Sequence, residues 1–296
     1  MNIVIADICF LIRCKELPVR RGHWKTYEPF IMDPVPAHAG LVSIQVNLEI
    51  GSFPPLDRAT RIFETPEAWS LFREGEEYFW IDVPASSGRA PDCLARFRRC
   101  PERVVVYCGQ DLITEAGGNK SVQNPISYPL DQVLLMYALA DRGGIFMHAS
   151  AVESNGKGYI FPGRSGAGKS TISRFFAATG YNLLSDDRIV VRKINGDFYA
   201  FGTPWAGDAG IAENRRLPLG GIFFLSQSSE NRIQKLTPAE AVERLMPVSS
   251  VPWFDKQAVP GILSFCEDLV LHVPAYDIFF KPDIGVVKLF EQFISG

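Results

Sequence analysis

Apolar and polar residues alternate most regularly between Leu41 and Ile50. Val42, Ile44, Val46, Leu48 and Ile50 fall on one side, and Ser43, Gln45, Asn47 and Glu49 fall on the other. A period of two residues predicts a β-strand with one buried face. Shorter apolar runs at Met1–Ile12, Tyr78–Val83 and Val104–Cys108 predict further strands. We therefore expect a β-rich region as far as residue 122, with residues 115–124 as a polar linker.

Helical and strand patterns alternate through the rest of the chain. Pro129–Asp141 is expected to be a well-buried helix, and a capping box at Thr237–Glu240 starts another. Strands and a terminal helix complete the pattern: strands are expected at Ile145–Glu153, Tyr159–Phe161, Tyr181–Leu184, Ile189–Ile194, Gly221–Leu225, Leu269–Val273 and Tyr276–Phe280, and the helix at Val286–Ile294. These patterns predict an α/β fold with two domains, a β-rich domain of unknown role at 1–122 and a second at 123–296.

Composition excludes several classes of function. The 296 residues are 47% hydrophobic and carry a net charge of −3. Without a long basic run, nucleic acid is not expected as a partner, and Arg96, Arg98 and Arg99 are interpreted as a solvated surface. The six cysteines form no C-x-x-C pair, so we expect reduced thiols in a cytoplasmic protein. No segment predicts a membrane span or signal peptide, and a homo-oligomer is compatible with the sequence.

A phosphate-binding motif provides the clearest chemistry. Residues Gly163, Arg164, Ser165, Gly166, Ala167, Gly168, Lys169, Ser170 and Thr171 fit the pattern G-x-x-x-x-G-K-[ST]. An apolar run precedes the motif and a helical pattern follows it, which is its expected context. Glycines allow backbone N–H groups to surround an anion, and the helix N-terminus adds partial positive charge. Lys169 can reach the β- and γ-phosphates of ATP, and the Ser170 hydroxyl can bind Mg²⁺.

Two acidic residues and a histidine lie near this motif along the chain. The pair Asp186-Asp187 follows Lys169 after one predicted helix and one predicted strand. That separation predicts that the carboxylates lie beside the phosphate loop, where they can bind Mg²⁺ or accept a proton. Alternatively, the pair caps a turn. His148 lies on the strand before the one that leads into the phosphate loop. It is interpreted either as a functional residue or as a buried structural residue of that strand.

Taken together, these segments resemble the HPr kinase/phosphorylase family. The similarity comprises Met147–Val152, Phe161–Thr171 and Leu183–Asp187, within about residues 125–225. Members of that family are serine kinases with a phosphate loop, and their core fold is related to that of the ATP-dependent phosphoenolpyruvate carboxykinases. Some relatives occur with peptide-modification systems, in which the target is a peptide serine.

The resemblance implies a role for each matching residue. Lys169 would bind nucleotide phosphate, and Ser170 and Asp187 would hold Mg²⁺. Asp186 would deprotonate the attacking serine hydroxyl. His148 would interact with the acidic residue and tune it. The catalytic residues implied are thus Asp186, His148 and Lys169.

The sequence departs from the family after the aspartate pair. It has no Glu-Ile-Arg-Gly-Leu-Gly signature, so the resemblance does not extend to HPr as the acceptor or to phosphorolysis. In its place stands Gly202–Asp208, interpreted either as a mobile loop in which Trp205 stacks on a base or substrate, or as a surface loop with a buried tryptophan. Arg215 and Arg216 are expected to neutralise the transferred phosphate, with solvated surface charges as the alternative.

The sequence therefore predicts an ATP- and Mg²⁺-dependent kinase with a P-loop core. Its acceptor would be a serine hydroxyl on a protein or peptide. Two alternatives remain: a nucleotide-binding regulator or scaffold with little catalysis, and a small-molecule kinase.

Overall fold

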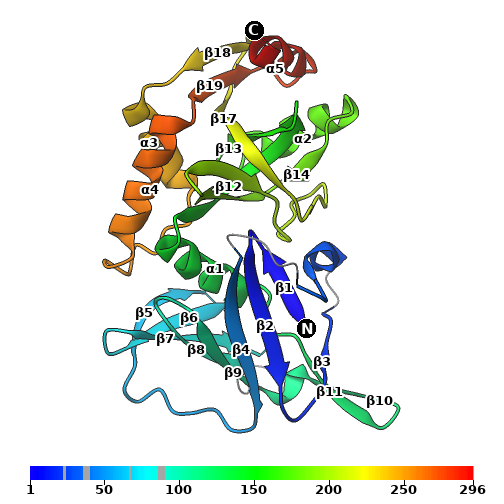
Figure 1. The fold of residues 1–296 in the computed structure, drawn as a ribbon, viewed down its shortest axis with the longest axis vertical. Helices are drawn as coiled ribbons and strands as arrows, with labels where there is room; N and C mark the ends of the chain where they lie inside the picture. Colours follow the sequence, from blue (N-terminus) through cyan, green and yellow to red (C-terminus); the bar gives the residue numbers. More distant parts are fainter. Residues whose placement is uncertain (23–24, 36–40, 67, 86–90, 296) are drawn as a thin grey trace. The chain divides into compact units, whose positions relative to one another are not determined.

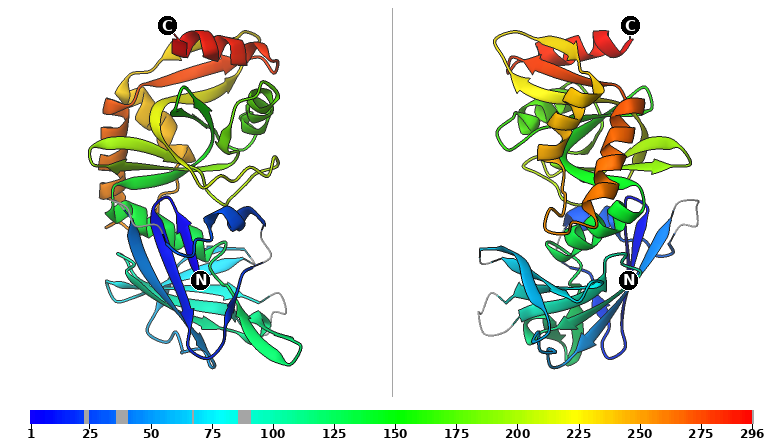
Figure 2. Two further views of the ribbon diagram at one scale, coloured as in Figure 1. Left: turned by 45° about the vertical axis from the view of Figure 1, so that its right-hand side comes forward. Right: turned by 90° about the vertical axis from the view of Figure 1, so that its left-hand side faces the viewer.

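The protein is described by a computed structural model covering residues 1–22, 25–35, 41–66, 68–85 and 91–295 (Figures 1 and 2). Its chain forms two compact units, each a mixed α/β structure with large sheets and few helices. Unit 1 comprises residues 1–25 and 31–141, and unit 2 comprises residues 26–30 and 142–296. No helix in these described ranges has the length and hydropathy needed to cross a bilayer.

Unit 1 is built on an eight-stranded sheet in the order β1-β2-β4-β9-β8-β7-β6-β5. Its strands are β1 (Asn2–Ile5), β2 (Ile8–Cys14), β4 (Val42–Ile50), β5 (Thr60–Thr65), β6 (Trp69–Glu74), β7 (Tyr78–Pro84), β8 (Pro91–Arg98) and β9 (Arg103–Cys108). The alternating segment is β4, and its inward residues Ile44, Val46 and Leu48 are almost fully buried as predicted. The predicted first strand is a β1–β2 hairpin, because Ala6 and Asp7 adopt positive φ angles and turn the chain.

Residues 115–124 are not a linker. β10 (Ile113–Ala116) and β11 (Asn119–Gln123) form a hairpin, and β11 pairs with β3 (Val19–Arg20). Gly117 and Gly118 both have positive φ angles, which suits the tight turn. Most residues of this hairpin are exposed or polar, so its sequence is similar to that of a linker.

Helix α1 (Leu130–Asp141) belongs to unit 1, so the units divide after residue 141 rather than at the expected 122–123. The buried ring of Tyr137 packs on Phe79 of β7 and Phe97 of β8, with centroids 5.0 and 5.5 Å away. These aromatic contacts attach the helix to the sheet. The described residues before α1 also form two short 3₁₀ helices, η1 (Lys25–Phe30) and η2 (Gln110–Leu112).

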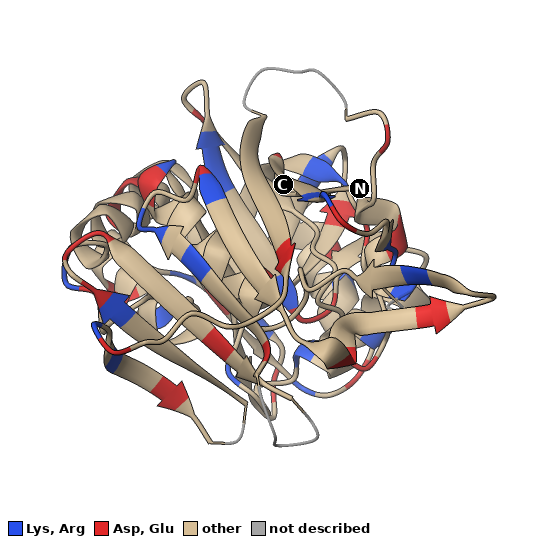
Figure 3. Ribbon diagram, turned by 90° about the horizontal axis from the view of Figure 1, so that it is seen from below, with Lys and Arg blue, Asp and Glu red and all other residues tan. Residues whose placement is uncertain are grey.

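The arginines of β8 and the following turn are engaged locally. Arg96 forms an ion pair with Glu74 at 3.0 Å and lies 4.0 Å above the Tyr78 ring, while Arg98 pairs with Glu77 at 3.3 Å. In Figure 3, basic residues (blue) and acidic residues (red) are interspersed along the strands. Such partly exposed pairs are typical of a solvated surface.

Unit 2 contains a second large sheet, whose pairings close on themselves. Its order is β13-β12-β15-β16-β17-β19-β18, with β14 beside β12 and an additional parallel pairing between β13 and β17. The strands are β12 (Gly144–Ser154), β13 (Lys157–Pro162), β14 (Leu183–Ser185), β15 (Arg188–Ile194), β16 (Asp197–Phe201), β17 (Arg216–Gln227), β18 (Arg232–Lys235) and β19 (Ala275–Phe280). The β12–β13 and β15–β16 hairpins turn at Asn155-Gly156 and Asn195-Gly196, where all four residues have the positive φ angles that Asn-Gly turns favour.

The helices of unit 2 are α2 (Lys169–Ala178), α3 (Pro238–Leu245), α4 (Val259–His272) and α5 (Gly285–Ser295), with a short 3₁₀ helix, η3 (Met246–Val248). The Thr237–Glu240 capping box is formed, as predicted. The predicted strand at Leu269–Val273 is wrong, because these residues end α4. Apolar residues occupy both faces of this helix end, since Leu269 is buried whereas Leu271 is 68% exposed. A continuous apolar run of this kind is also typical of a buried strand, which explains the wrong prediction.

An aromatic core holds α2 and α5 against the sheet. Fully buried Phe290 of α5 contacts Phe161, Phe176 and Phe223, with ring centroids 5.2–5.5 Å away. Since Phe161 and Phe176 flank the glycine-rich segment in sequence, this core fixes the strand and helix on either side of it.

We expect Phe290→Ala to lower the free energy of unfolding by about 3–5 kcal/mol, because it leaves a large cavity in this core. Phe293→Ala on the same helix is the control, since Phe293 is 40% exposed and its replacement should cost clearly less. Urea denaturation of both variants measures the difference. Equal losses would contradict this description of the core.

Candidate functional site

The glycine-rich loop, residues Gly163–Gly168, connects β13 to α2. Gly163 N–H donates to the His148 carbonyl at 3.1 Å, so the loop starts against β12. Gly166 and Gly168 have φ angles of 80° and 105°, which side chains rarely adopt. At Gly168 a Cβ would also lie 2.4 Å from the Phe280 ring. The glycine positions of the motif therefore satisfy backbone requirements, and α2 begins immediately after the loop.

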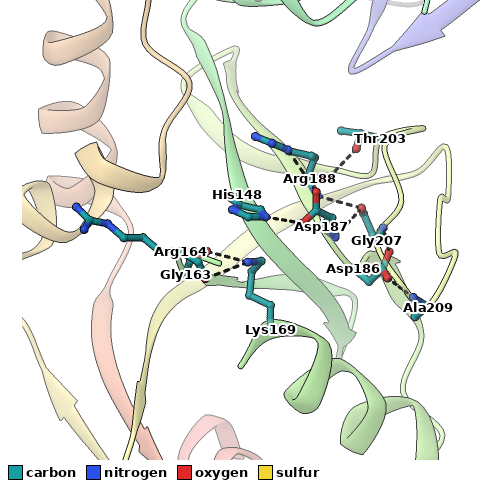
Figure 4. Close-up of polar contacts among 11 residues, drawn as sticks. His148, Gly163, Arg164, Lys169, Asp186, Asp187, Arg188, Thr203, Gly207 and Ala209 are labelled. Carbon is teal, nitrogen blue, oxygen red and sulfur yellow. Dashed lines mark hydrogen bonds and ion pairs between the residues drawn. The ribbon is translucent and has the colours of Figure 1, made fainter. Parts of the chain in front are cut away.

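Lys169 is the first residue of α2 and is 7% exposed. Its Nζ donates to the carbonyls of Gly163 at 2.9 Å and Arg164 at 3.3 Å, so the side chain folds back over the loop (Figure 4). Burial lowers the pKa of Lys169 below its ordinary value, while the negative charge of Asp187 partly opposes that shift. A buried ammonium held by two neutral carbonyls is well placed to gain a stronger partner from an anion.

His148 and Asp187 form a close pair. His148 lies on β12, and its Nε2 is 2.5 Å from Asp187 Oδ1 (Figure 4). Arg188 Nε lies 3.4 Å from the other carboxylate oxygen. The pairing follows from the sheet register, in which His148 is opposite Arg188 and Ala149 N–H donates to the Asp187 carbonyl. Burial alone would raise the pKa of Asp187, but the hydrogen bond and charge of His148, with Arg188 and Lys169, hold it below its ordinary value.

Asp186 has different surroundings from its neighbour. Its side chain is 2% exposed, and its two oxygens accept hydrogen bonds from the backbone N–H groups of Gly207 at 2.8 Å and Ala209 at 2.7 Å. The aspartate pair is therefore split between a carboxylate beside His148 and one that faces a loop backbone (Figure 4). The expected contact between His148 and an acidic residue is made with Asp187 rather than Asp186.

A cavity of about 360 Å³ lies over the glycine-rich loop. Its lining residues are His148, Ser165, Gly166, Gly168, Lys169, Ser170, Thr171, Asp187, Gly207, Asp208 and Gln227. Most of the sequence-predicted site residues thus surround one space. The exceptions among them are Gly163, Arg164, Ala167 and Asp186, which do not belong to this lining.

The segment Gly202–Asp208 is anchored rather than loosely attached. Trp205 is 8% exposed, its Nε1 donates to the Tyr27 hydroxyl at 3.1 Å, and its ring packs on Phe146. It is therefore a buried core residue, and the alternative in which it stacks on a base or substrate is not supported. The tip of the segment nevertheless reaches the cavity through Gly207 and Asp208.

Arg215 and Arg216 are engaged away from this cavity. Arg215 pairs with Glu153 at 2.9 Å, and Arg216 lies 5.5 Å from the Tyr199 ring. Neither belongs to the described residues that line the cavity. The expectation that they neutralise a transferred phosphate therefore has no support in this geometry.

Gln227 is the lining residue that sequence reasoning missed. It ends β17, and its Nε2 donates to the Gly166 carbonyl at 3.0 Å. β17 lies beside β13 through a parallel pairing of segments about 60 residues apart. No local sequence signal marks such a residue, because only the strand order brings it to the loop.

The donors around the cavity suit a metal ion carried by phosphate. Within the described part of the chain, no three His, Cys, Asp or Glu residues gather as a protein-only metal site. Mg²⁺ commonly takes one or two protein oxygens together with substrate phosphates and waters. The Ser170 hydroxyl and the Asp187 carboxylate are oxygen donors of this kind at the cavity wall.

The lowered pKa of Asp187 predicts a pH-dependent contribution to stability. A carboxyl whose pKa is lower in the folded than in the unfolded state stabilises the fold above the unfolded value, about 3.9, and this contribution is lost as the pH falls through the native pKa. We expect the difference in unfolding free energy between the wild type and Asp187→Asn to be larger at pH 6 than below pH 3. Urea denaturation across this range measures it, and a constant difference would contradict the paired geometry.

Comparisons with known proteins find a family that matches part of the chain and a weakly similar solved structure. Residues 126–259, somewhat less than half of the chain, match the model of a family described as SynChlorMet cassette protein ScmC. A solved structure of the Hpr(Ser) kinase/phosphatase from Coxiella burnetii is similar with a TM-score of 0.31 and 12% sequence identity, over 51% of this chain and 99% of that one. A likeness at this level does not establish a shared fold. No curated protein matches the chain.

Proposed function

We propose that this protein is an ATP-dependent kinase that phosphorylates a serine hydroxyl on a peptide or protein. The observation that carries the proposal is that the glycine-rich loop, the first residues of α2 and the His148–Asp187 pair line the same cavity. This arrangement offers an anion-binding surface and a proton-accepting group within one space. Phosphoryl transfer needs both, and positioning and electrostatics supply most of its rate.

The phosphate-binding part would use the loop backbone, the α2 N-terminus and Lys169. Lys169 would exchange its bonds to the Gly163 and Arg164 carbonyls for bonds to phosphate oxygens. A charge-assisted hydrogen bond to phosphate is stronger than one to a neutral carbonyl, so the exchange is favourable. Mg²⁺ bound with ATP would offset charge on the β- and γ-phosphates. Of the two oxygen donors at the cavity wall, the Ser170 hydroxyl would be its protein ligand, and Asp187 would give up the expected metal-binding role for proton acceptance.

The proton-accepting part would be the His148–Asp187 pair. With a pKa below its ordinary value, Asp187 is ionised near neutral pH, and an ionised carboxylate can receive the proton from an attacking hydroxyl. His148 would orient the carboxylate through its 2.5 Å contact. This assignment transfers the acceptor role expected for Asp186 to its neighbour, because Asp187 lines the cavity whereas Asp186 is 2% exposed and does not belong to the lining.

The nature of the acceptor is decided by where the γ-phosphate goes. Purified protein would be incubated with Mg²⁺, γ-labelled ATP and a cell extract, with Lys169→Met as the inactive control. Label in a polypeptide as phosphoserine is the expected result. Label in a metabolite would identify a small-molecule kinase instead, and nucleotide binding without any transfer would identify a regulator or scaffold.

A further inference from the structure

Asp186 and the segment Gly207–Ala209 form a tight buried contact at the edge of the cavity. The Asp186 carboxylate accepts from two backbone N–H groups two residues apart, Gly207 and Ala209. A Cβ at Gly207 would lie 3.0 Å from Asp186 Oδ2 and 3.1 Å from the Asp187 Cβ. The loop backbone thus packs directly on both aspartates, and a side chain at Gly207 would crowd them.

Gly207–Ala209 lie at the tip of a longer loop, residues 202–213. In the described part of the chain, other hydrogen bonds hold the two ends of this loop but do not reach its tip. Gly202 N–H donates to the Arg215 carbonyl, Thr203 Oγ1 donates to the Arg188 carbonyl at 2.7 Å, and Glu213 N–H donates to the Leu184 carbonyl. At the tip, Gly210 N–H donates back to the Gly207 carbonyl at 3.1 Å, which closes a turn. Among the hydrogen bonds of the described residues, those accepted by the Asp186 side chain connect this turn to the rest of the site.

We propose that Asp186 is a positioning residue, whose buried carboxylate holds Gly207–Ala209 in place as a wall of the cavity beside Asp187. Gly207 and Asp208 line the cavity, so the wall contacts whatever occupies it. The inference rests on the proposed function only for the part of its test that measures turnover. It separates the two adjacent aspartates by role: Asp187 acts on the reacting hydroxyl, and Asp186 acts through the loop.

Both carboxylate oxygens of Asp186 are required because each accepts a backbone hydrogen bond. Asn at position 186 keeps one acceptor, but its NH₂ group would face a backbone N–H, so one hydrogen bond is replaced by repulsion between two donors. A buried N–H left without an acceptor is costly. The tip of the loop should then open locally while the contacts at Gly202, Thr203 and Glu213 persist.

Hydrogen exchange of Asp186→Asn tests the positioning role. We expect amides in residues 207–210 to exchange at least roughly tenfold faster than in the wild type, with β12 and β13 unchanged. Asp277→Asn is the matched control, since Asp277 is also buried (4% exposed) but pairs with Arg244, away from this loop. Unchanged exchange at 207–210 in Asp186→Asn would overturn the proposal.

Turnover distinguishes a positioning residue from a proton acceptor. We expect Asp186→Asn to lose roughly tenfold in transfer rate with an unchanged pH profile, whereas loss of a general base costs about 10²–10⁴-fold. A loss above a hundredfold with normal loop exchange would make Asp186 the base and overturn the proposal. Were the wild type to show no transfer, the proposed function would fail while the exchange measurement still decided the loop contact.

Gly207→Ala tests the same contact should Asp186→Asn fold poorly. Its added Cβ would crowd the Asp186 carboxylate without removing it. We expect the same faster exchange at 207–210. Protection equal to that of the wild type would count against the proposal.

Discussion

Asp187→Asn is expected to lower the rate of phosphoryl transfer by about 10²–10⁴-fold while leaving affinity for MgADP within a few fold. An amide cannot accept the proton of the attacking hydroxyl, but it retains the size and much of the hydrogen bonding of the carboxylate. The cavity and the glycine-rich loop remain, so the nucleotide should still bind. Single-turnover transfer from labelled ATP, together with equilibrium binding of MgADP, measures the two effects separately.

Asp197→Asn is a suitable control for this variant. Asp197 lies at the exposed start of β16, in a hairpin turn away from the cavity. Its replacement should leave both transfer and binding unchanged. Near-normal transfer by Asp187→Asn would exclude Asp187 as the proton acceptor and make His148 the next candidate.

Lys169→Met is expected to weaken nucleotide binding by roughly 10- to 100-fold, the value of losing charge-assisted hydrogen bonds to phosphate. The melting temperature of the free protein should not fall, and we expect it to rise. Burial lowers the pKa of Lys169 in the folded state, so at neutral pH the charged lysine opposes folding. Met fills a similar volume without a charge.

Thermal melts with and without MgATP measure both effects at once. The wild type should gain stability from the nucleotide by mass action, and Lys169→Met should gain much less at the same concentration. Lys157→Met is the control, because Lys157 is an exposed residue at the start of β13. A large fall in melting temperature with unchanged nucleotide response would mean that Lys169 has a structural role.

Local sequence patterns predicted several elements of the fold. The alternation at β4 and the Thr237–Glu240 capping box each act within a few residues, and both are formed. The glycine-rich loop was recognisable because its φ angles and close contacts demand glycine at fixed spacings. Such features depend on local backbone geometry, which a short stretch of sequence determines.

The parts that were missed depend on pairings between distant segments. Gln227 reaches the loop only through the parallel pairing of β17 with β13, and the Asp186 bonds to Gly207 and Ala209 arise from a loop 21–23 residues further along the chain. The sequence could mark two adjacent aspartates but could not tell which one faces the cavity. The sequence likewise left both alternatives for Trp205 open, because its contact with Tyr27, which is distant in sequence, decides that it is buried.

Hydrogen exchange of the full chain with and without MgATP tests most directly whether this cavity is a nucleotide site. The account predicts increased protection of residues 163–171, where backbone N–H groups would meet phosphate, and of residues 185–187 beside them. Protection should depend on Mg²⁺ and should be largely lost in Lys169→Met. Saturating MgATP that leaves residues 163–171 unprotected, or that protects a different part of the chain, would contradict the proposed site.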